Sequence, residues 1–104
     1  MANFITGLFG VKQNKDYREL MHNGAVIIDV RTKGEFQAGH IKNSLNIPLD
    51  TLSSNLSTLK KDRVLICCCA SGMRSGAAKS ILTSNGFNEV YNGGAWTNLQ
   101  NRID

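Results

Sequence analysis

Three consecutive cysteines, at positions 67 to 69, carry the most reactive side chains of this sequence. They close an apolar run from Val64 to Cys69, which is typical of a strand covered on both faces. Small residues follow, and the apolar spacing from Ala77 onward predicts a helix, with Gly86 suited to the left-handed position after its end. Cys69 is therefore expected at the carboxyl edge of a sheet, where open α/β sheets bind their ligands.

The residues after Cys69 can surround its sulfur with groups that favour negative charge. Gly72 and its small neighbours let the loop curl, so that successive backbone N–H groups point inward. The helix predicted to begin near Arg74 adds unpaired N–H groups, and the guanidinium adds a permanent cation. Such settings lower a thiol pKa from about 8.5 by one to several units. We therefore predict that Cys69 is a thiolate nucleophile, with substrate bound by Ala70, Ser71, Gly72, Met73, Arg74 and Ser75.

Three separate motifs between Ala25 and Trp96 resemble those of rhodanese-like sulfurtransferases. The loop from Cys69 to Ser75 is similar to the active-site loop of the family. The other two motifs are Asp29-Val30-Arg31 with Glu35-Phe36, Gly39-His40-Ile41 and Asn46-Ile47-Pro48, and Gly86-Phe87 with Asn92-Gly93-Gly94 and Trp96. Fewer residues than usual separate the glycine pair from the tryptophan, so the last turn is expected to be tightened.

The resemblance implies a single-domain α/β protein of the thiosulfate sulfurtransferase type. It implies a rhodanese-like fold around a central, mostly parallel five-stranded sheet with helices on both faces. It also implies that Cys69 takes a sulfane sulfur from thiosulfate or a similar small anionic donor, carries it as a persulfide, and passes it to a thiol or to cyanide. No cofactor is implied, and the acceptor can be a small molecule or a partner protein.

Asp29, Arg31 and Glu35 are expected to support the site rather than to react. Thr32 and Glu35 have the spacing of a capping box that opens a short helix. The resemblance implies that Arg31 and Glu35 form a structural ion pair that holds this turn. His40 has the chemistry of a general base, but its place at a turn predicts backbone contacts instead.

Helices alternate with strands along the chain, which favours a mostly parallel sheet covered on both faces. Asn14 is a suitable cap for a first helix that Gly24 ends. Part of the core is expected to be covered by Met1 to Gln13, with room for a short first strand. The further elements expected are strands 25–30, 44–47 and 89–92, a helix with inward Leu52, Leu56 and Leu59, a turn at Gly93-Gly94, and a closing helix with inward Trp96, Leu99 and Ile103.

Length and charge limit what else the chain can be. Its 104 residues are expected to form one domain, residues 1–104, and 12 basic against 8 acidic residues give a net charge of +4. The densest basic run, Lys60 to Arg63, is predicted to be a solvated loop, so no nucleic-acid partner is expected. The apolar segment from Phe4 to Val11 is too short to span a bilayer, so no membrane partner is expected either, and the chain is expected to be a monomer.

Adjacent cysteines in one strand point to opposite faces and cannot all reach one metal ion. No metal site is therefore expected, and reduced thiols favour a cytoplasmic location. Cys67 and Cys68 are expected to be structural, because a free cysteine in a buried strand behaves as a small hydrophobe.

Two other functions remain open at this point. A Cdc25-like phosphatase or arsenate reductase shares the fold but needs five residues between its cysteine and arginine. Four residues separate Cys69 from Arg74, and five separate Cys68 from it, so a shift of one position would favour that class. We prefer sulfur transfer, because Gly72 and Ser75 match the sulfurtransferase pattern only with Cys69 as the nucleophile. A persulfide carrier that acts with a partner protein is the third possibility.

Overall fold

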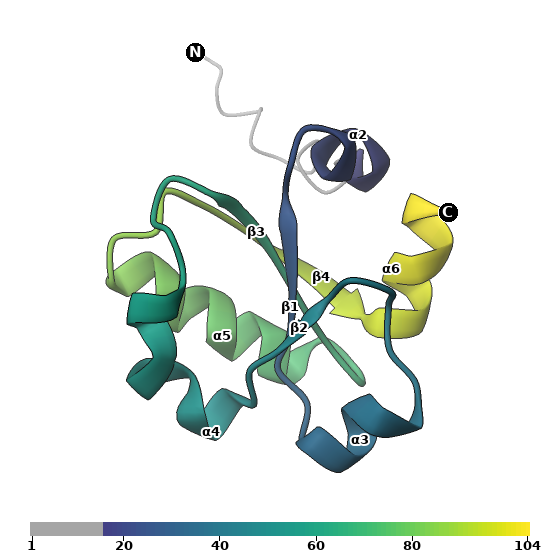
Figure 1. Ribbon diagram of the computed structural model, residues 1–104, viewed down its shortest axis with the longest axis horizontal. Coiled ribbons are helices and arrows are strands. Elements are labelled where there is room, and N and C mark those ends of the chain that lie inside the picture. The colour runs from purple at the N-terminus through teal and green to yellow at the C-terminus, as the bar shows by residue number, and fades with distance from the viewer. Residues whose placement is uncertain (1–15) are drawn as a thin grey trace, which may run out of the picture.

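Four parallel strands form the centre of the protein in the computed structural model, which describes residues 16–104 (Figure 1). The strands are β1 (Val26–Asp29), β2 (Leu45–Asn46), β3 (Val64–Cys69) and β4 (Glu89–Ala95), in the order β2-β1-β3-β4. The expectation of five strands is therefore wrong for the described residues, whose sheet has four. The short first strand suggested for Met1 to Gln13 falls outside them.

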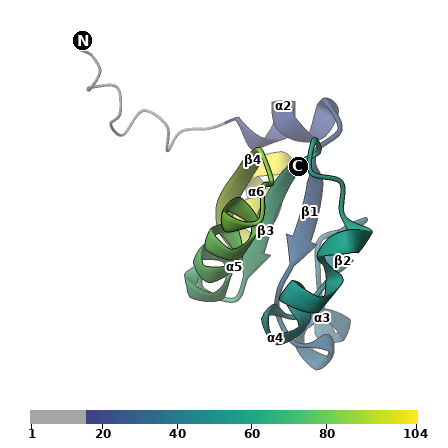
Figure 2. The same ribbon diagram turned by 90° about the vertical axis from the view of Figure 1, so that its left-hand side faces the viewer.

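Helices cover both faces of this sheet, as the alternation of elements predicts. They are α2 (Tyr17–His22), α3 (Lys33–Ala38), α4 (Leu49–Leu52), α5 (Met73–Ser84), α6 (Trp96–Ile103) and the 3-10 helix η2 (Ser53–Thr58). In Figure 1, α4 and α5 lie to the left of the strands and α6 to the right, while α3 lies beyond their carboxyl ends. Figure 2 shows α5 packed along β3 and β4.

The two faces have separate cores, and the three cysteines divide between them. Cys67 and Cys69 belong to the core under α4, η2 and α5, together with Leu52 and Leu82. Cys68 belongs to the core under α2 and α6, together with Leu99. Alternation along β3 thus sends the middle sulfur away from the other two, as expected for adjacent strand residues.

Two predicted details of the helices are wrong. The first helix is capped by Asp16, whose side chain accepts a hydrogen bond from the backbone N–H of Glu19, and not by Asn14, which lies outside the described residues. The segment with inward Leu52 and Leu56 is one α-helical turn continued as a 3-10 helix. Its three serines and one asparagine compete with regular helix formation through local hydrogen bonds.

The glycine pair does not turn the chain as predicted. β4 continues through Gly93 and Gly94 to Ala95, and α6 follows at once. Cys67 pairs with Asn92 and Cys68 with Gly94, so Gly93 is the extra residue of a β-bulge. A Cβ atom on Gly93 would lie 2.9 Å from side-chain carbons of both Ile66 and Leu99, which explains the glycine.

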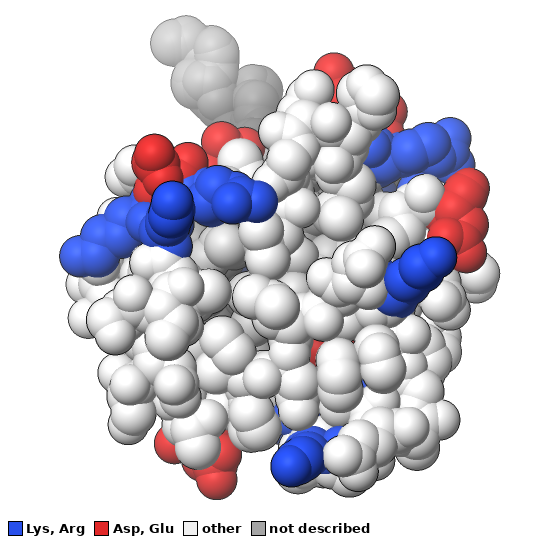
Figure 3. Space-filling model, viewed as in Figure 1, with Lys and Arg blue, Asp and Glu red and all other residues white. Residues whose placement is uncertain are grey.

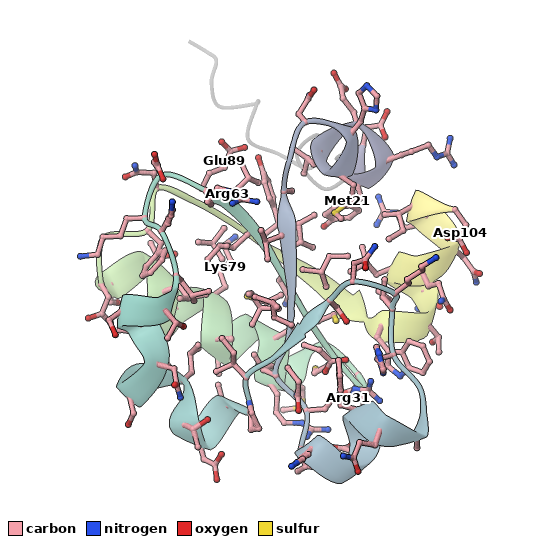
Figure 4. All side chains as sticks on the ribbon, in the orientation of Figure 1. Met21, Arg31, Arg63, Lys79, Glu89 and Asp104 are labelled. Carbon is pink, nitrogen blue, oxygen red and sulfur yellow. The ribbon has the colours of Figure 1, made fainter. Side chains whose placement is uncertain are left out.

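The surface carries charges of both signs. Figure 3 shows Lys and Arg side chains interspersed with Asp and Glu around the rim of one face, whose centre is mostly uncharged. Figure 4 places Arg31 near α3, and Arg63 and Glu89 toward the opposite end of the sheet. Among residues 16–104, no helix has the length and apolar character needed to cross a bilayer.

Candidate active site

The loop between β3 and α5 wraps around the Cys69 sulfur. Cys69 is the last residue of β3, and α5 begins four positions later at Met73. Gly72 precedes the helix with a φ of 102°, a left-handed conformation that a side chain would strain. This turn directs the loop back over the sulfur, as the small residues of the sequence predict.

The sulfur accepts hydrogen bonds from two backbone groups of this loop. The N–H groups of Gly72 and Ser75 lie 3.0 Å and 3.3 Å from Cys69 Sγ, and the Ser75 hydroxyl oxygen lies 3.4 Å from it. Cys69 has no exposed area, whereas Met73 on the rim of the loop is 83% exposed. The geometry is that of a socket for a negatively charged atom.

These contacts change the acidity of Cys69. Burial by itself raises the pKa of the thiol, but hydrogen bonds from the Ser75 side chain and from the backbone N–H groups of Ser75, Gly72 and Ser71 outweigh it. The pKa of Cys69 is therefore held below its ordinary value. The nucleophilic role itself stays a prediction, and the local electrostatics are those that such a role requires.

The pKa values of the other two cysteines shift in the opposite direction. Burial is the main cause that raises the pKa of Cys67 and that of Cys68 to about 12 each. Both are fully buried free thiols. Cys68 points into the core on the other face of the sheet, so the five-residue spacing to Arg74 does not place its sulfur in the socket.

Glu35 binds Arg74, which corrects the ion pair expected between Arg31 and Glu35. The Arg74 guanidinium donates to Glu35 Oε1 at 2.7 Å and to Oε2 at 3.0 Å, across the gap between α5 and α3. The hydrogen bond from Arg74 is the largest cause that lowers the pKa of Glu35, to about 2. Thr32 and Glu35 also form the predicted capping box.

Arg31 has a different partner, the buried carboxylate of Asp29. Its Nε and Nη2 donate to Asp29 at distances between 2.7 Å and 3.1 Å, and further bonds go to the backbone carbonyls of Glu35 and Gly39. The guanidinium also lies 4.8 Å from the centre of the Trp96 ring. The predicted supporting role of Asp29 and Arg31 therefore takes the form of a buried pair that ties β1, α3 and α6 together.

A cavity of about 270 Å³ opens beside the loop on the Arg74 side. Its lining residues are Val30, Thr32, Pro48, Leu49, Asp50 and Arg74. His40 is not part of it, since its Nδ1 contacts the carbonyl oxygen of Phe36 at 2.7 Å and its ring stacks on that of Phe36. Within the described part of the chain, no three His, Cys, Asp or Glu side chains are grouped so that they could hold a metal ion.

Asn92 is a site residue that the sequence analysis missed. Its Oδ1 lies 2.6 Å from the Ser75 hydroxyl oxygen, and its Nδ2 donates to the backbone carbonyl of Gly72 at 3.2 Å. Asn92 thus binds two residues of the loop from the neighbouring strand. One sequence feature could have identified it. Asn92 comes directly before the glycine pair, at the carboxyl end of a strand predicted to be parallel to β3.

Comparisons with known proteins agree with this geometry. The family model of the rhodanese-like domain matches residues 13–99. The YqhL protein of Bacillus subtilis (strain 168), described as uncharacterized, is 40% identical over 68 residues, which are 65% of this chain and 54% of that protein. The thiosulfate sulfurtransferase GlpE of Ectopseudomonas mendocina (strain ymp) is 36% identical over 74 residues, which are 71% of this chain and 68% of that enzyme.

A solved structure shows the same arrangement of elements. The structure described as rhodanese with anions from E. coli superposes with a TM-score of 0.67 at 32% identity, over 71% of this chain and 89% of that one. The family model covers well over half of the present sequence, including β1, the β3–α5 loop and β4. On this evidence, the chain belongs to the family of rhodanese-like domains.

Proposed function

We propose that this protein is a sulfurtransferase that moves a sulfane sulfur from a small anionic donor to an acceptor through a persulfide on Cys69. The observation that carries the proposal is the pair of backbone N–H groups, from Gly72 and Ser75, directed at a sulfur at the carboxyl end of β3. A socket of this kind stabilises a thiolate before the reaction and the anionic terminal sulfur of a persulfide after it.

The reaction proceeds in two balanced steps. The Cys69 thiolate attacks the outer sulfur of thiosulfate, a sulfur–sulfur bond forms, and sulfite leaves with the electrons of the bond that breaks. A nucleophile, either cyanide or a thiolate, then attacks the outer sulfur of the persulfide, and thiocyanate or a new persulfide leaves as the Cys69 thiolate is restored. Neither step needs a separate base once the thiolate is present.

Thiosulfate is the donor class that the relatives favour, because the GlpE protein is described as a thiosulfate sulfurtransferase. The cavity beside the loop has room for a small oxyanion next to Arg74. Since Arg74 is paired with Glu35, the backbone N–H groups provide the uncompensated positive potential for the donor. Three free thiols suit a reducing compartment such as the cytoplasm, and no partner other than donor and acceptor is needed.

Mass spectrometry of the intact protein tests this function. After incubation with thiosulfate alone, the chain is expected to gain one sulfur atom, and the Cys69→Ser variant to gain none. Addition of cyanide should remove the added sulfur and release thiocyanate in equal amount. A chain that never gains sulfur from thiosulfate, or gains it equally without Cys69, would contradict the proposal.

The phosphatase alternative receives no support from the site. Cys69 lies one residue too close to Arg74 for the longer oxyanion loop, and Cys68 faces the other core. We expect no hydrolysis of an aryl phosphate above the rate of the Cys69→Ser variant. The carrier alternative differs only in the acceptor, and efficient cyanide turnover would argue for the free-standing enzyme.

A further inference from the structure

The orientation of the Asn92 side chain is fixed by the backbone around it. Its Oδ1 accepts a hydrogen bond from the N–H of Gly94 at 3.0 Å, and its Nδ2 donates to the carbonyl of Gly72 at 3.2 Å. Exchanging the two ends of the amide would set donor against donor at Gly94 and acceptor against acceptor at Gly72. The group that faces Ser75 is therefore an oxygen, which can only accept.

The Ser75 hydroxyl has one proton and three acceptors around it. Its oxygen lies 2.6 Å from Asn92 Oδ1, 3.1 Å from the Gly72 carbonyl oxygen and 3.4 Å from Cys69 Sγ. Two oxygens at 2.6 Å need a proton between them, and the amide oxygen carries none. While Cys69 is a neutral thiol, the hydroxyl therefore donates to Asn92, and its lone pair accepts the S–H proton.

Ionisation of Cys69 reverses this arrangement. The thiolate has no proton to give, so a Ser75 lone pair that faces it becomes unfavourable. Its negative charge makes it a stronger acceptor than an amide oxygen, and the hydroxyl proton turns toward it. Asn92 Oδ1 then loses the bond from Ser75 and keeps its bond from Gly94.

We propose that Asn92 is a positioning residue that competes with the Cys69 thiolate for the Ser75 hydroxyl proton, and so sets how readily the thiol ionises. Its catalytic meaning rests on the proposed function, but ionisation of Cys69 can be measured with no sulfur donor present. Asn92 makes the resting thiol less acidic than the loop alone would make it. It thereby limits the fraction of reactive thiolate at neutral pH.

The charged groups around Cys69 do not provide this effect by themselves. Arg74 on α5 is paired with Glu35 on α3, and Arg31 is paired with Asp29 at the end of β1. Cys67 and Cys68 stay neutral over the range in which Cys69 titrates, because each pKa is about 12. From β4 the group presented to the loop is the neutral amide of Asn92.

A double-mutant cycle on the whole chain tests the competition, with thiolate absorbance at 240 nm as the measure of the Cys69 pKa and the Cys69→Ser variant as blank. Asn92→Ala is expected to lower that pKa by about one unit, the size of one hydrogen bond to a charged group. In a Ser75→Ala background, Asn92→Ala should leave the pKa unchanged. A purely structural role of Asn92 would loosen the N–H socket and shift the pKa upward, in both backgrounds.

The proposal is overturned if Asn92→Ala raises the pKa of Cys69, leaves it unchanged, or shifts it equally with and without the Ser75 hydroxyl. The unmodified protein offers a second measurement, should the variants fail to fold. The carbonyl carbon of the Asn92 side chain should change its NMR chemical shift at the midpoint of Cys69 ionisation, and should not do so in the Cys69→Ser variant. A signal that is flat across that midpoint would equally overturn the proposal.

The two proposals fail in different ways. Absence of a persulfide after thiosulfate, combined with the expected coupling between Asn92 and Ser75, would reject the function and keep the inference. Persulfide formation without that coupling would keep the function and reject the inference.

Discussion

The neighbouring strands β1 and β3 end at the same edge of the sheet in opposite ways. After β1, side chains hold the turn in place, since the buried carboxylate of Asp29 binds Arg31, which is 4% exposed. We call this Asp29–Arg31 pair the β1 closure. After β3, backbone groups do this instead, since N–H groups of the loop donate hydrogen bonds to the Cys69 sulfur. We call this arrangement the β3 closure. Asp29 pairs with Cys68 in the sheet, so the two closures lie side by side.

The difference shows how one edge divides support from chemistry. The opposite charges of Asp29 and Arg31 neutralise each other, and additional bonds to backbone carbonyls satisfy the guanidinium. The loop around Cys69 directs donors at a single atom and supplies no fixed counter-charge of its own, because Arg74 is bound to Glu35. A negative charge is thus favoured at the sulfur, where the proposed reaction requires one.

Removing the sulfur of Cys69 should have the largest effect on activity. Cys69→Ser is expected to reduce thiosulfate-dependent sulfur transfer by roughly 10³-fold or more, as loss of an enzyme nucleophile does. The fold should survive, because the β1 closure is intact. Thiocyanate release measures the activity and a urea melt the fold, with Cys67→Val as the matched control. Loss of activity in Cys68→Ser, with activity retained in Cys69→Ser, would move the nucleophile to the other face.

Breaking the β1 closure should instead destabilise the fold. Arg31→Met leaves the fully buried Asp29 carboxylate without its partner, which typically costs about 3–5 kcal/mol of unfolding free energy. Urea denaturation measures the loss. The added change Asp29→Leu should recover much of it, since a buried charge no longer remains. Near-parental stability of Arg31→Met would show that the carboxylate is satisfied by other groups.

The pair between Arg74 and Glu35 should tune donor affinity by a smaller amount. Glu35→Gln frees the guanidinium and should lower the KM for thiosulfate a few-fold, whereas Arg74→Ala should raise it, both with little change in kcat. Steady-state kinetics at constant ionic strength measure both, with Lys33→Ala on the exposed start of α3 as the charge control. Equal KM values in all three variants would contradict a role for Arg74 in donor binding.

The pair between Arg74 and Glu35 should persist over a wide range of pH. Hydrogen bonding from Arg74 holds the pKa of Glu35 at about 2, below its unfolded value, so the charged pair is present above that range and is lost only as pH falls toward about 2. The KM difference between the parent protein and Glu35→Gln should therefore stay constant from about pH 5 to about pH 8. A difference that disappears within that window would show that the pair opens in solution.

Changes to the two buried cysteines should have the smallest effect. Cys67→Val and Cys68→Val should leave turnover within a few-fold of the parent and cost at most about 1.5 kcal/mol, because volume is roughly kept. The persulfide lifetime without acceptor is the sharper measurement. A lifetime much longer in the double Val variant would identify one of these thiols as a resolving cysteine.

Local pattern was sufficient to predict the elements that place Cys69. The apolar run at 64–69, the capping box at Thr32 and the glycine at position 86 were all read correctly, because neighbours in sequence determine each of them. The fifth strand came from the family resemblance and not from a pattern in residues 16–104. The count of five is therefore wrong for the described residues, in which no pattern predicted a fifth strand.

The partners of the side chains could not be read from the sequence. Arg31 had two acidic residues within reach along the chain, and the turn after β1 decided that Asp29 is its partner. Glu35 pairs with Arg74, from a helix far along the chain, which depends on the distance between α3 and α5. Asn92 pairs with Cys67, whose side chain lies in the core under α5, and its own side chain bonds to the loop from that strand position. The bulge that follows at Gly93 was missed because glycine pairs more often indicate turns.

The absence of exposed area at Cys69 has a kinetic consequence. A reagent can meet the sulfur only in conformations in which the loop has moved aside, so the observed rate is the product of an opening equilibrium and an intrinsic rate. Small and bulky alkylating agents of equal intrinsic reactivity should therefore differ strongly in rate, and mild denaturant should reduce that difference. The same steric filter shields an acidic thiol from large oxidants and from mixed disulfides between substrate encounters.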